Sequence, residues 1–199
     1  MKKESKLKHL FVSLMMVGCT FGVASCSDDD DDPVKTDPTV EDVKGDYSGK
    51  MFVSVHTNET YSTAAEQGTE IDATVKNDTV YFEDFPVRDI IASVVPEEMV
   101  EGIVEALGKV KYGVGYKATM NTEKDSIFME FNPKPLELNF SMGESEMSVK
   151  VDVSAAEKGN YSIEKKKMKF AIVADEVTVG DKLIEDFYKP QFSFDMNQK

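Results

Sequence analysis

The 199-residue sequence is poor in the residues that most often carry chemistry, with two cysteines, two histidines and no tryptophan. Both cysteines, Cys19 and Cys26, lie near the N-terminus, so none is left for the rest of the chain. This absence excludes thiol catalysis, zinc–cysteine sites and disulfide frameworks from the folded part. Its stability must come from an apolar core, for which 12 phenylalanines, 7 tyrosines and 11 methionines supply volume.

The sequence also lacks the motifs of well-known enzyme classes. Gly-x-Ser-x-Gly, His-Glu-x-x-His, phosphate loops and the Gly-x-Gly-x-x-Gly fingerprint are all missing. His56, the only histidine beyond His9, is predicted on the polar face of a strand, and Gly113-Val114-Gly115 is interpreted as a bend in a barrel strand. Acidic pairs are too frequent to single out two glycosidase carboxylates, and the Asp-x-Asp-x-Asp-Gly calcium loop is absent. We therefore expect no enzyme, no catalytic residue, no metal and no cofactor.

Basic residues are scarce, with 23 lysines and arginines against 37 acidic residues. Without residues 1–25, which hold one glutamate and four lysines, the net charge is −17. Nucleic acid is excluded as a partner, because phosphate binding needs clustered Lys and Arg. The one basic cluster, Lys165-Lys166-Lys167 with Lys169, is predicted to be an exposed hairpin.

The N-terminus has the features of a secretory signal. Residues 1–9 carry four lysines, and an uncharged run, 10–24, follows that is too short to span a membrane. Val23-Ala24-Ser25-Cys26 resembles the lipobox of bacterial lipoproteins. By this resemblance residues 1–25 are a signal peptide, and Cys26 becomes the lipidated first residue, held in the membrane by several acyl chains.

An acidic run follows the lipidation site. Ser27 and Asp28 to Asp32 look like the surface-export signal of lipoproteins from gut anaerobes. Residues 26–44 are predicted to form a disordered tether, because they are rich in Asp and poor in apolar side chains. We expect a lipid-anchored protein of the outer membrane that faces the cell exterior. The aspartates can also be a solvated spacer, and the two interpretations are compatible.

Residues 45–199 are predicted to form a single β domain. Apolar residues alternate with polar ones from Tyr47 to Val55 and in later runs that start at Ile71, Val80, Tyr112, Ile127, Leu136, Met147, Met168 and Phe192. Asn77-Asp78, Pro133-Lys134-Pro135 and Gly159-Asn160 are interpreted as turns, and 58–68 as a loop. Strands at this spacing predict an antiparallel up-and-down β-barrel or a sandwich of about 8–10 strands.

A short helical insertion interrupts the strands after the third. Apolar residues from Ile90 to Leu107 follow helical spacing, broken at Pro96, and Gly108 fits a C-terminal cap. We predict two short helices within about 87–108.

The start of the domain carries a second resemblance. Val43 to Met51, with its Gly-x-Tyr-x-Gly pattern, is similar to the opening strand of calycin-like β-barrel lipoproteins of gut anaerobes, which are families of unknown function. The lipobox, the acidic tether and the final Phe-x-Phe strand add to the likeness. The resemblance implies a barrel and transfers no catalytic residue.

Methionines on predicted inward faces suit an adaptable apolar site. Small barrels can hold one small ligand. The predicted cavity is lined by Met51, Tyr112, Tyr116, Met120, Phe140, Met147 and Met168. An ordinary packed core explains the same pattern. Asp78-Thr79-Val80 and Asp125-Ser126-Ile127 look like O-glycosylation sites of exported proteins, with acceptors Thr79 and Ser126.

Three functions remain open from the sequence. The first is a non-enzymatic module that binds a small apolar molecule or a glycan fragment. The second is an accessory protein of a cell-envelope complex, with an exposed apolar patch on the predicted helices. The third is a hydrolase.

Overall fold

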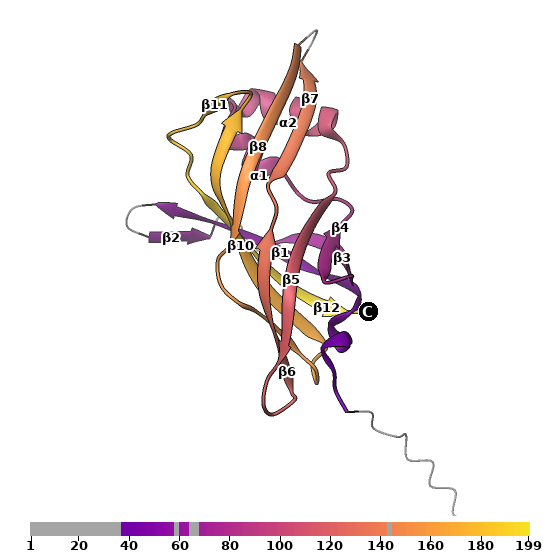
Figure 1. The fold of residues 1–199 in the computed structure, drawn as a ribbon. Coiled ribbons are helices and arrows are strands. Elements are labelled where there is room, and N and C mark those ends of the chain that lie inside the picture. Colours follow the sequence, from indigo (N-terminus) through magenta and orange to yellow (C-terminus); the bar gives the residue numbers. More distant parts are fainter. Residues whose placement is uncertain (1–36, 58–59, 64–67, 143–144) are drawn as a thin grey trace, which may run out of the picture. The chain divides into compact units, whose positions relative to one another are not determined.

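The computed structural model describes residues 37–57, 60–63, 68–142 and 145–199. The predicted signal peptide, Cys26 and the first part of the tether lie outside these residues. Within the described residues, eight antiparallel strands close into a barrel in the order β12-β1-β3-β4-β5-β6-β9-β10, and β10 pairs back with β12 (Figure 1). The prediction of a mainly β, up-and-down barrel is confirmed, and the closure by β10 and β12 decides against a sandwich.

Most barrel strands pair with the barrel strand that follows them in the chain, and β1 also pairs with the last strand, β12. The bounds of the barrel strands are β1 (Gly45–Thr57), β3 (Thr69–Lys76), β4 (Thr79–Phe82), β5 (Tyr112–Met120), β6 (Ser126–Pro133), β9 (Gly159–Ser162), β10 (Lys167–Val179) and β12 (Pro190–Gln198). The turn between β3 and β4 uses Asn77 and Asp78, both with positive φ (49° and 53°), as the sequence predicted. Such two-residue turns match the twist of a hairpin.

A long hairpin extends the barrel at one end. β7 (Leu136–Met142) continues β6, and β8 (Ser145–Ala155) precedes β9 and pairs with the second half of β10. β11 (Lys182–Leu183) pairs with the end of β10, and β2 (Thr60–Thr63) pairs with the end of β1. Figure 1 shows β7 and β8 beyond the barrel strands and β2 to one side.

Stacked phenylalanine rings fill the barrel interior. The ring centroids of Phe131 and Phe170 lie 4.4 Å apart, as do those of Phe170 and Phe194, and Phe82 lies 5.2 Å from Phe194. Phe85 extends the row, 5.6 Å from Phe82. The stacked rings come from β4, β6, β10 and β12, and Phe85 from the loop after β4. Their contacts add to the free energy of burial.

Two helices in the described part lie between β4 and β5, where a helical insertion was predicted. They follow the fourth strand rather than the third, because the prediction did not include β2. α1 (Arg88–Ala92) and α2 (Glu97–Leu107) are separated at Pro96, and Gly108 caps α2 with a φ of +60°. Ile90, Ile91, Val100 and Ile103 are buried in the same core as the barrel. Five further apolar residues of this segment are only partly buried against that core: Val94, Val95, Met99, Val104 and Leu107. The exposed apolar patch expected of an accessory protein stays a prediction.

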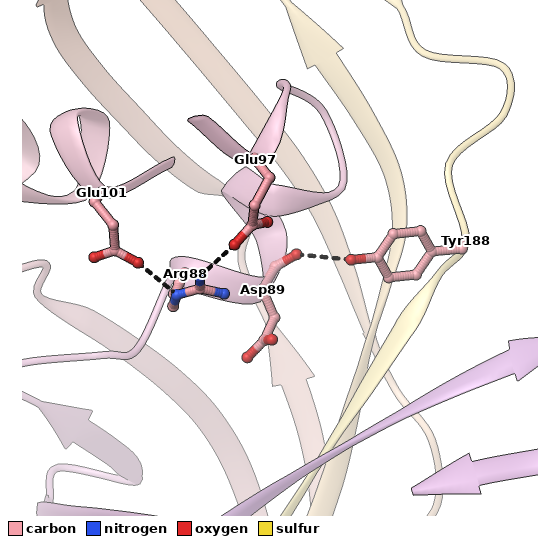
Figure 2. A network of polar contacts seen from close by, with 5 residues as sticks. All are labelled: Arg88, Asp89, Glu97, Glu101 and Tyr188. Atoms are coloured by element: carbon pink, nitrogen blue, oxygen red, sulfur yellow. Dashed lines mark hydrogen bonds and ion pairs between the residues drawn. The ribbon is translucent and has the colours of Figure 1, made fainter. Parts of the chain in front are cut away.

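A polar network fixes the two helices and the chain before β12 (Figure 2). The Arg88 guanidinium donates to Glu97 at 2.6 Å and to Glu101 at 2.8 Å, which ties α1 to α2. The Tyr188 hydroxyl donates to the Asp89 carbonyl at 3.0 Å. All three ion-paired side chains are substantially exposed, so we regard this network as a positioning feature.

The barrel end beside the β3–β4 turn is closed by a 3-10 helix, η1 (Val40–Val43). Val43 is buried, and the Tyr47 hydroxyl donates to its carbonyl at 2.6 Å. Gln198 donates to the carbonyls of Asp42 (3.0 Å) and Lys44 (2.8 Å). The compact unit thus begins at Asp37. Residues 37–44 belong to it and not to the predicted tether.

Two further expectations differ from the structure. Gly159 and Asn160 do not form a turn but begin β9. The turn lies at 163–166 and contains Lys165 and Lys166, as the predicted basic hairpin requires. A Cβ at Gly159 would lie 2.5 Å from the Phe131 ring, so the glycine makes room for core packing. Thr60–Thr63, inside the predicted loop, form β2 because they pair with the end of β1.

Candidate functional site

A groove of about 610 Å³ lies on the outer face of the barrel, over β4, β5 and β6. Its volume is in the range of small-molecule sites. The lining residues come from these strands, the β3–β4 turn and the linker that follows β6. They are Asp78, Thr79, Tyr81, Tyr112, Gly113, Gly115, Tyr116, Lys117, Glu130, Asn132, Lys134 and Pro135.

The floor of the groove is made by two glycines of β5. Tyr112, Val114 and Tyr116 are buried, so the intervening Gly113 and Gly115 face outward. The register places Gly113 beside Tyr81 of β4, and Gly115 between Thr79 of β4 and Asn132 of β6. Because neither glycine carries a side chain, the outer surface is hollow at this point.

Neither packing nor backbone conformation explains Gly115. A Cβ built there would meet only the Asn132 carbonyl oxygen, at an ordinary 3.5 Å, and the φ of Gly115 is not in the left-handed region. β5 pairs continuously with β4 and β6 across both glycines, so they do not interrupt the ladder as a bend would. Glycine weakens a strand, and in a strand interior it often marks the close approach of a ligand.

Tyr81 forms an aromatic wall of the groove. A Cβ at Gly113 would lie 3.5 Å from its ring, so the ring stands directly beside the floor. The Lys76 ammonium lies 5.3 Å from the ring centroid, which is a cation–π contact. Lys76 is on β3, which pairs with β4 on the side opposite to β5, so Lys76 and the two glycines lie on opposite sides of Tyr81.

Charged side chains line the groove on the β5 and β6 side. Glu130 ion-pairs with Lys158 at 2.6 Å. The hydrogen bond from Lys158, its charge and the more distant charge of Lys117 lower the pKa of Glu130. Lys117 lies opposite Glu130 in the ladder. The Tyr112 hydroxyl donates to the Lys134 carbonyl at 2.7 Å, which fixes the linker after β6.

The Tyr116 hydroxyl is buried and has no hydrogen-bond partner among the described residues. Burial raises its pKa to about 12, with a smaller contribution from the negative charge of Asp78. By contrast, the buried hydroxyls of Tyr47 and Tyr161 have acceptors, the Val43 carbonyl and the Gln198 side chain at 2.7 Å.

The seven predicted cavity residues are not brought together in any of the pockets described. Tyr112 and Tyr116 border the outer groove. Met51 and Met168 are fully buried, and Met120 is partly buried against the same core. Phe140 and Met147 line a separate hollow of about 450 Å³ over the paired strands β7 and β8. An inward cavity shared by all seven stays a prediction.

The remaining predicted sites lie apart from one another. Thr79 lines the groove, and its hydroxyl donates to the Asn77 carbonyl at 3.2 Å. Ser126 begins β6, opposite Ser162 of β9. Cys26 and the His56 side chain lie outside the described part of the chain.

Sequence reasoning missed Tyr81, Gly115, Lys117 and Asn132 as a group. The available signal was the pair of glycines at alternate positions of one strand, which place two missing side chains on the same face.

Among the described residues, no three His, Cys, Asp or Glu side chains are grouped so that they could hold a metal ion. The helices in this part of the chain are also too short or too polar to cross a membrane.

The profile of a family described as domain of unknown function (DUF4840) matches residues 42–179. The chain belongs to this family. The DUF4840 match includes all three strands of the groove and ends with β10, before the strand that closes the barrel. No curated protein and no solved structure matches the chain. Beyond the barrel itself, the likeness to calycin-like lipoproteins stays a prediction.

Proposed function

We propose that this DUF4840 protein is a non-enzymatic binding module that holds a glycan fragment in the groove over β4, β5 and β6. The observation that carries the proposal is Gly115, a strand glycine that the fold does not require and whose missing side chain opens the groove. A strand position that keeps glycine without a packing or dihedral reason indicates that something approaches it closely.

The lining of the groove fits a sugar better than a small apolar molecule. The Tyr81 ring offers a flat apolar face, and Thr79, Asn132 and Glu130 offer polar groups within the same hollow. Binding sites of this kind combine an aromatic surface with a few polar groups that fix orientation. The barrel interior, where an apolar ligand was expected, is occupied by stacked phenylalanine rings.

The proposal includes a lipid anchor at Cys26, which would hold the domain on the outer membrane, facing outward. The lipobox-like Val23-Ala24-Ser25-Cys26 and the aspartates after it support this. Labelling cells with an acyl-chain probe tests it. The label is expected on the wild-type protein and not on Cys26→Ala. Protease added to intact cells should degrade the protein, and complete protection would contradict outward display.

The binding proposal is tested by filling the groove. The full-length chain in detergent is screened against arrayed neutral and acidic oligosaccharides, and hits are measured by calorimetry. Gly115→Val places a side chain on the floor and is expected to weaken binding at least tenfold. Thr119→Val is the matched control, because Thr119 is exposed on the same strand but outside the groove.

Three outcomes would contradict the proposal. One is the absence of any glycan that binds above background. Another is equal binding by wild type and Gly115→Val, with Gly115→Ala as a second variant should the valine form not fold. A sugar found covalently attached to Thr79 in protein from its native host would also count against it, since Thr79 lines the groove and its glycan would occupy the site.

A further inference from the structure

The charges around the groove point to the class of glycan. We propose that the groove binds an acidic oligosaccharide, one whose sugars carry carboxylate groups. This inference rests on the proposed function and adds a property that a neutral-sugar site would not have. Its basis is a set of lysine side chains that the groove holds without full compensation.

Lys117 and Lys134 both line the groove, and among the described residues neither forms an ion pair. Lys117 lies directly opposite Glu130 in the ladder, but Glu130 is already bound by Lys158 at 2.6 Å. Two ammonium groups thus share the Glu130 carboxylate. The remaining acid of the lining, Asp78, lies in the β3–β4 turn at the Lys117 end of the groove, where its carbonyl accepts a hydrogen bond from the Tyr116 amide at 2.9 Å.

The position of Lys134 is set by its neighbours. Pro133 and Pro135 flank it and restrict the backbone, and the Tyr112 hydroxyl holds its carbonyl at 2.7 Å. Because the backbone at Lys134 is already fixed, less conformational entropy is lost when its ammonium group binds an anion. More of the electrostatic attraction therefore remains as binding free energy.

The two lysines stand at opposite ends of the glycine floor. Val114 pairs with Pro133, so Lys134 follows at the level of Gly113, whereas Lys117 lies beyond Gly115 on β5 itself. From the level of Gly113 to Lys117 there are four steps along the strand, which span roughly 13 Å. This separation suits an extended ligand with acid groups on more than one sugar, rather than a single small anion.

The groove is less acidic than the protein as a whole. The chain has a net charge of −14, whereas the groove lining holds two lysines, Lys117 and Lys134, against two acids, Asp78 and Glu130, and Lys158 outside the lining neutralises Glu130. An acidic protein repels acidic ligands over most of its surface, and a site where lysines offset the acids allows them to dock at one place.

The test compares two ligands with the same sugar backbone, one with charged carboxylates and one with neutral methyl esters in their place. The full-length chain is titrated with a galacturonate tetramer and with the same tetramer as its methyl ester. The free acid is expected to bind at least tenfold more tightly. That advantage should disappear in the Lys117→Gln/Lys134→Gln double variant and shrink at about 1 M salt, where charges are screened within about 3 Å. The matched control is Lys165→Gln/Lys166→Gln, which removes two lysines of the hairpin outside the groove.

The outcomes separate this inference from the proposed function. Equal binding of acid and ester, lost in both cases with Gly115→Val, would overturn the acidic-ligand inference and leave the glycan site intact. If the Lys117→Gln/Lys134→Gln variant still prefers the acid, the inference is also overturned, because residues other than these two lysines would then recognise the charge. Failure of both tetramers and of all arrayed neutral and acidic glycans would overturn the proposed function as well.

Discussion

The two faces of β5 differ more than the faces of a strand usually do. On the inner face Tyr112, Val114 and Tyr116 are buried among the core residues. On the outer face the two positions between them are glycines, and the surface there is hollow. Burial in the core explains the apolar side chains of the inner face. It does not explain Gly115 on the outer face, where a Cβ would meet only a carbonyl oxygen at an ordinary 3.5 Å, and this difference is the reason for proposing a binding site there.

Glycines elsewhere in the barrel sharpen the contrast. A Cβ at Gly49 of β1 would lie 2.2 Å from the Asp195 carbonyl oxygen and 2.6 Å from the Met196 Cα, both in the backbone of β12. Gly49 is thus required for two strands to approach each other. Gly115 has no such neighbour, so the same residue type serves the fold in one region and leaves space in another.

The largest expected effect comes from opening the filled interior. Phe194 lies between Phe170 and Phe82 in the ring stack. Phe194→Ala is expected to lower the free energy of unfolding by about 3–5 kcal/mol through lost burial and a residual cavity. Urea unfolding measures this. Phe128→Ala is the control on the outer face, where the ring is 45% exposed, and a similar loss in both would contradict the comparison.

Crowding the contact between β1 and β12 comes next. Gly49→Ala drives a methyl group into the backbone of β12, which cannot yield as a flexible side chain can. We expect a loss of about 3 kcal/mol, at the upper end for overpacking. Thermal unfolding compares it with Gly115→Ala. Equal melting temperatures for the two variants would show that the glycines do not differ in role.

The buried hydroxyls give a smaller effect. Tyr47→Phe removes the 2.6 Å hydrogen bond to the Val43 carbonyl, and we expect a loss of about 1 kcal/mol. Tyr116→Phe removes a hydroxyl without a partner, so its stability should change by less than about 0.5 kcal/mol or rise. Denaturant unfolding of both variants checks this. A larger loss for Tyr116→Phe would indicate that its hydroxyl is bonded in solution.

The smallest expected effect on stability belongs to the groove floor. Gly115→Ala adds a methyl group at an ordinary contact distance, 3.5 Å from the Asn132 carbonyl oxygen, and replaces a poor strand former, so stability should stay within about 0.5 kcal/mol of wild type or increase slightly. Its effect should appear in glycan binding instead, as a weakening in calorimetry. A marked loss of stability would mean that Gly115 is required by the fold after all.

Much of the fold was predictable because alternation and turn residues are local signals. The run from Tyr112 to Met120 forms β5, Asn77-Asp78 forms the predicted turn, and Pro96 separates the two helices. Gly159-Asn160 was misread as a turn because the role of Gly159 depends on the Phe131 ring, which comes from another strand. The short β2 was missed because its pairing with β1, rather than its composition, makes it a strand.

The groove was much less predictable than the fold. Its residues have no common spacing in the sequence: Tyr81, Gly115 and Asn132 lie on three different strands. Only Tyr112 and Tyr116 of the predicted cavity border it, and they do so from the inner face of β5. The methionines were chosen as inward-facing, but whether inward side chains surround a space depends on how the opposite strands fill it.

By itself, the sequence determined most of the strands, most of the turns and which side chains of the long strands face the core, because these follow from neighbours two to four residues apart. Only the tertiary structure decided that β10 pairs with β12 to close a barrel, and that Tyr81, Gly115, Asn132, Lys117 and Lys134 share one hollow. The physical reason is register. Pairing between strands places outward residues side by side across the ladder, and no single strand carries that information.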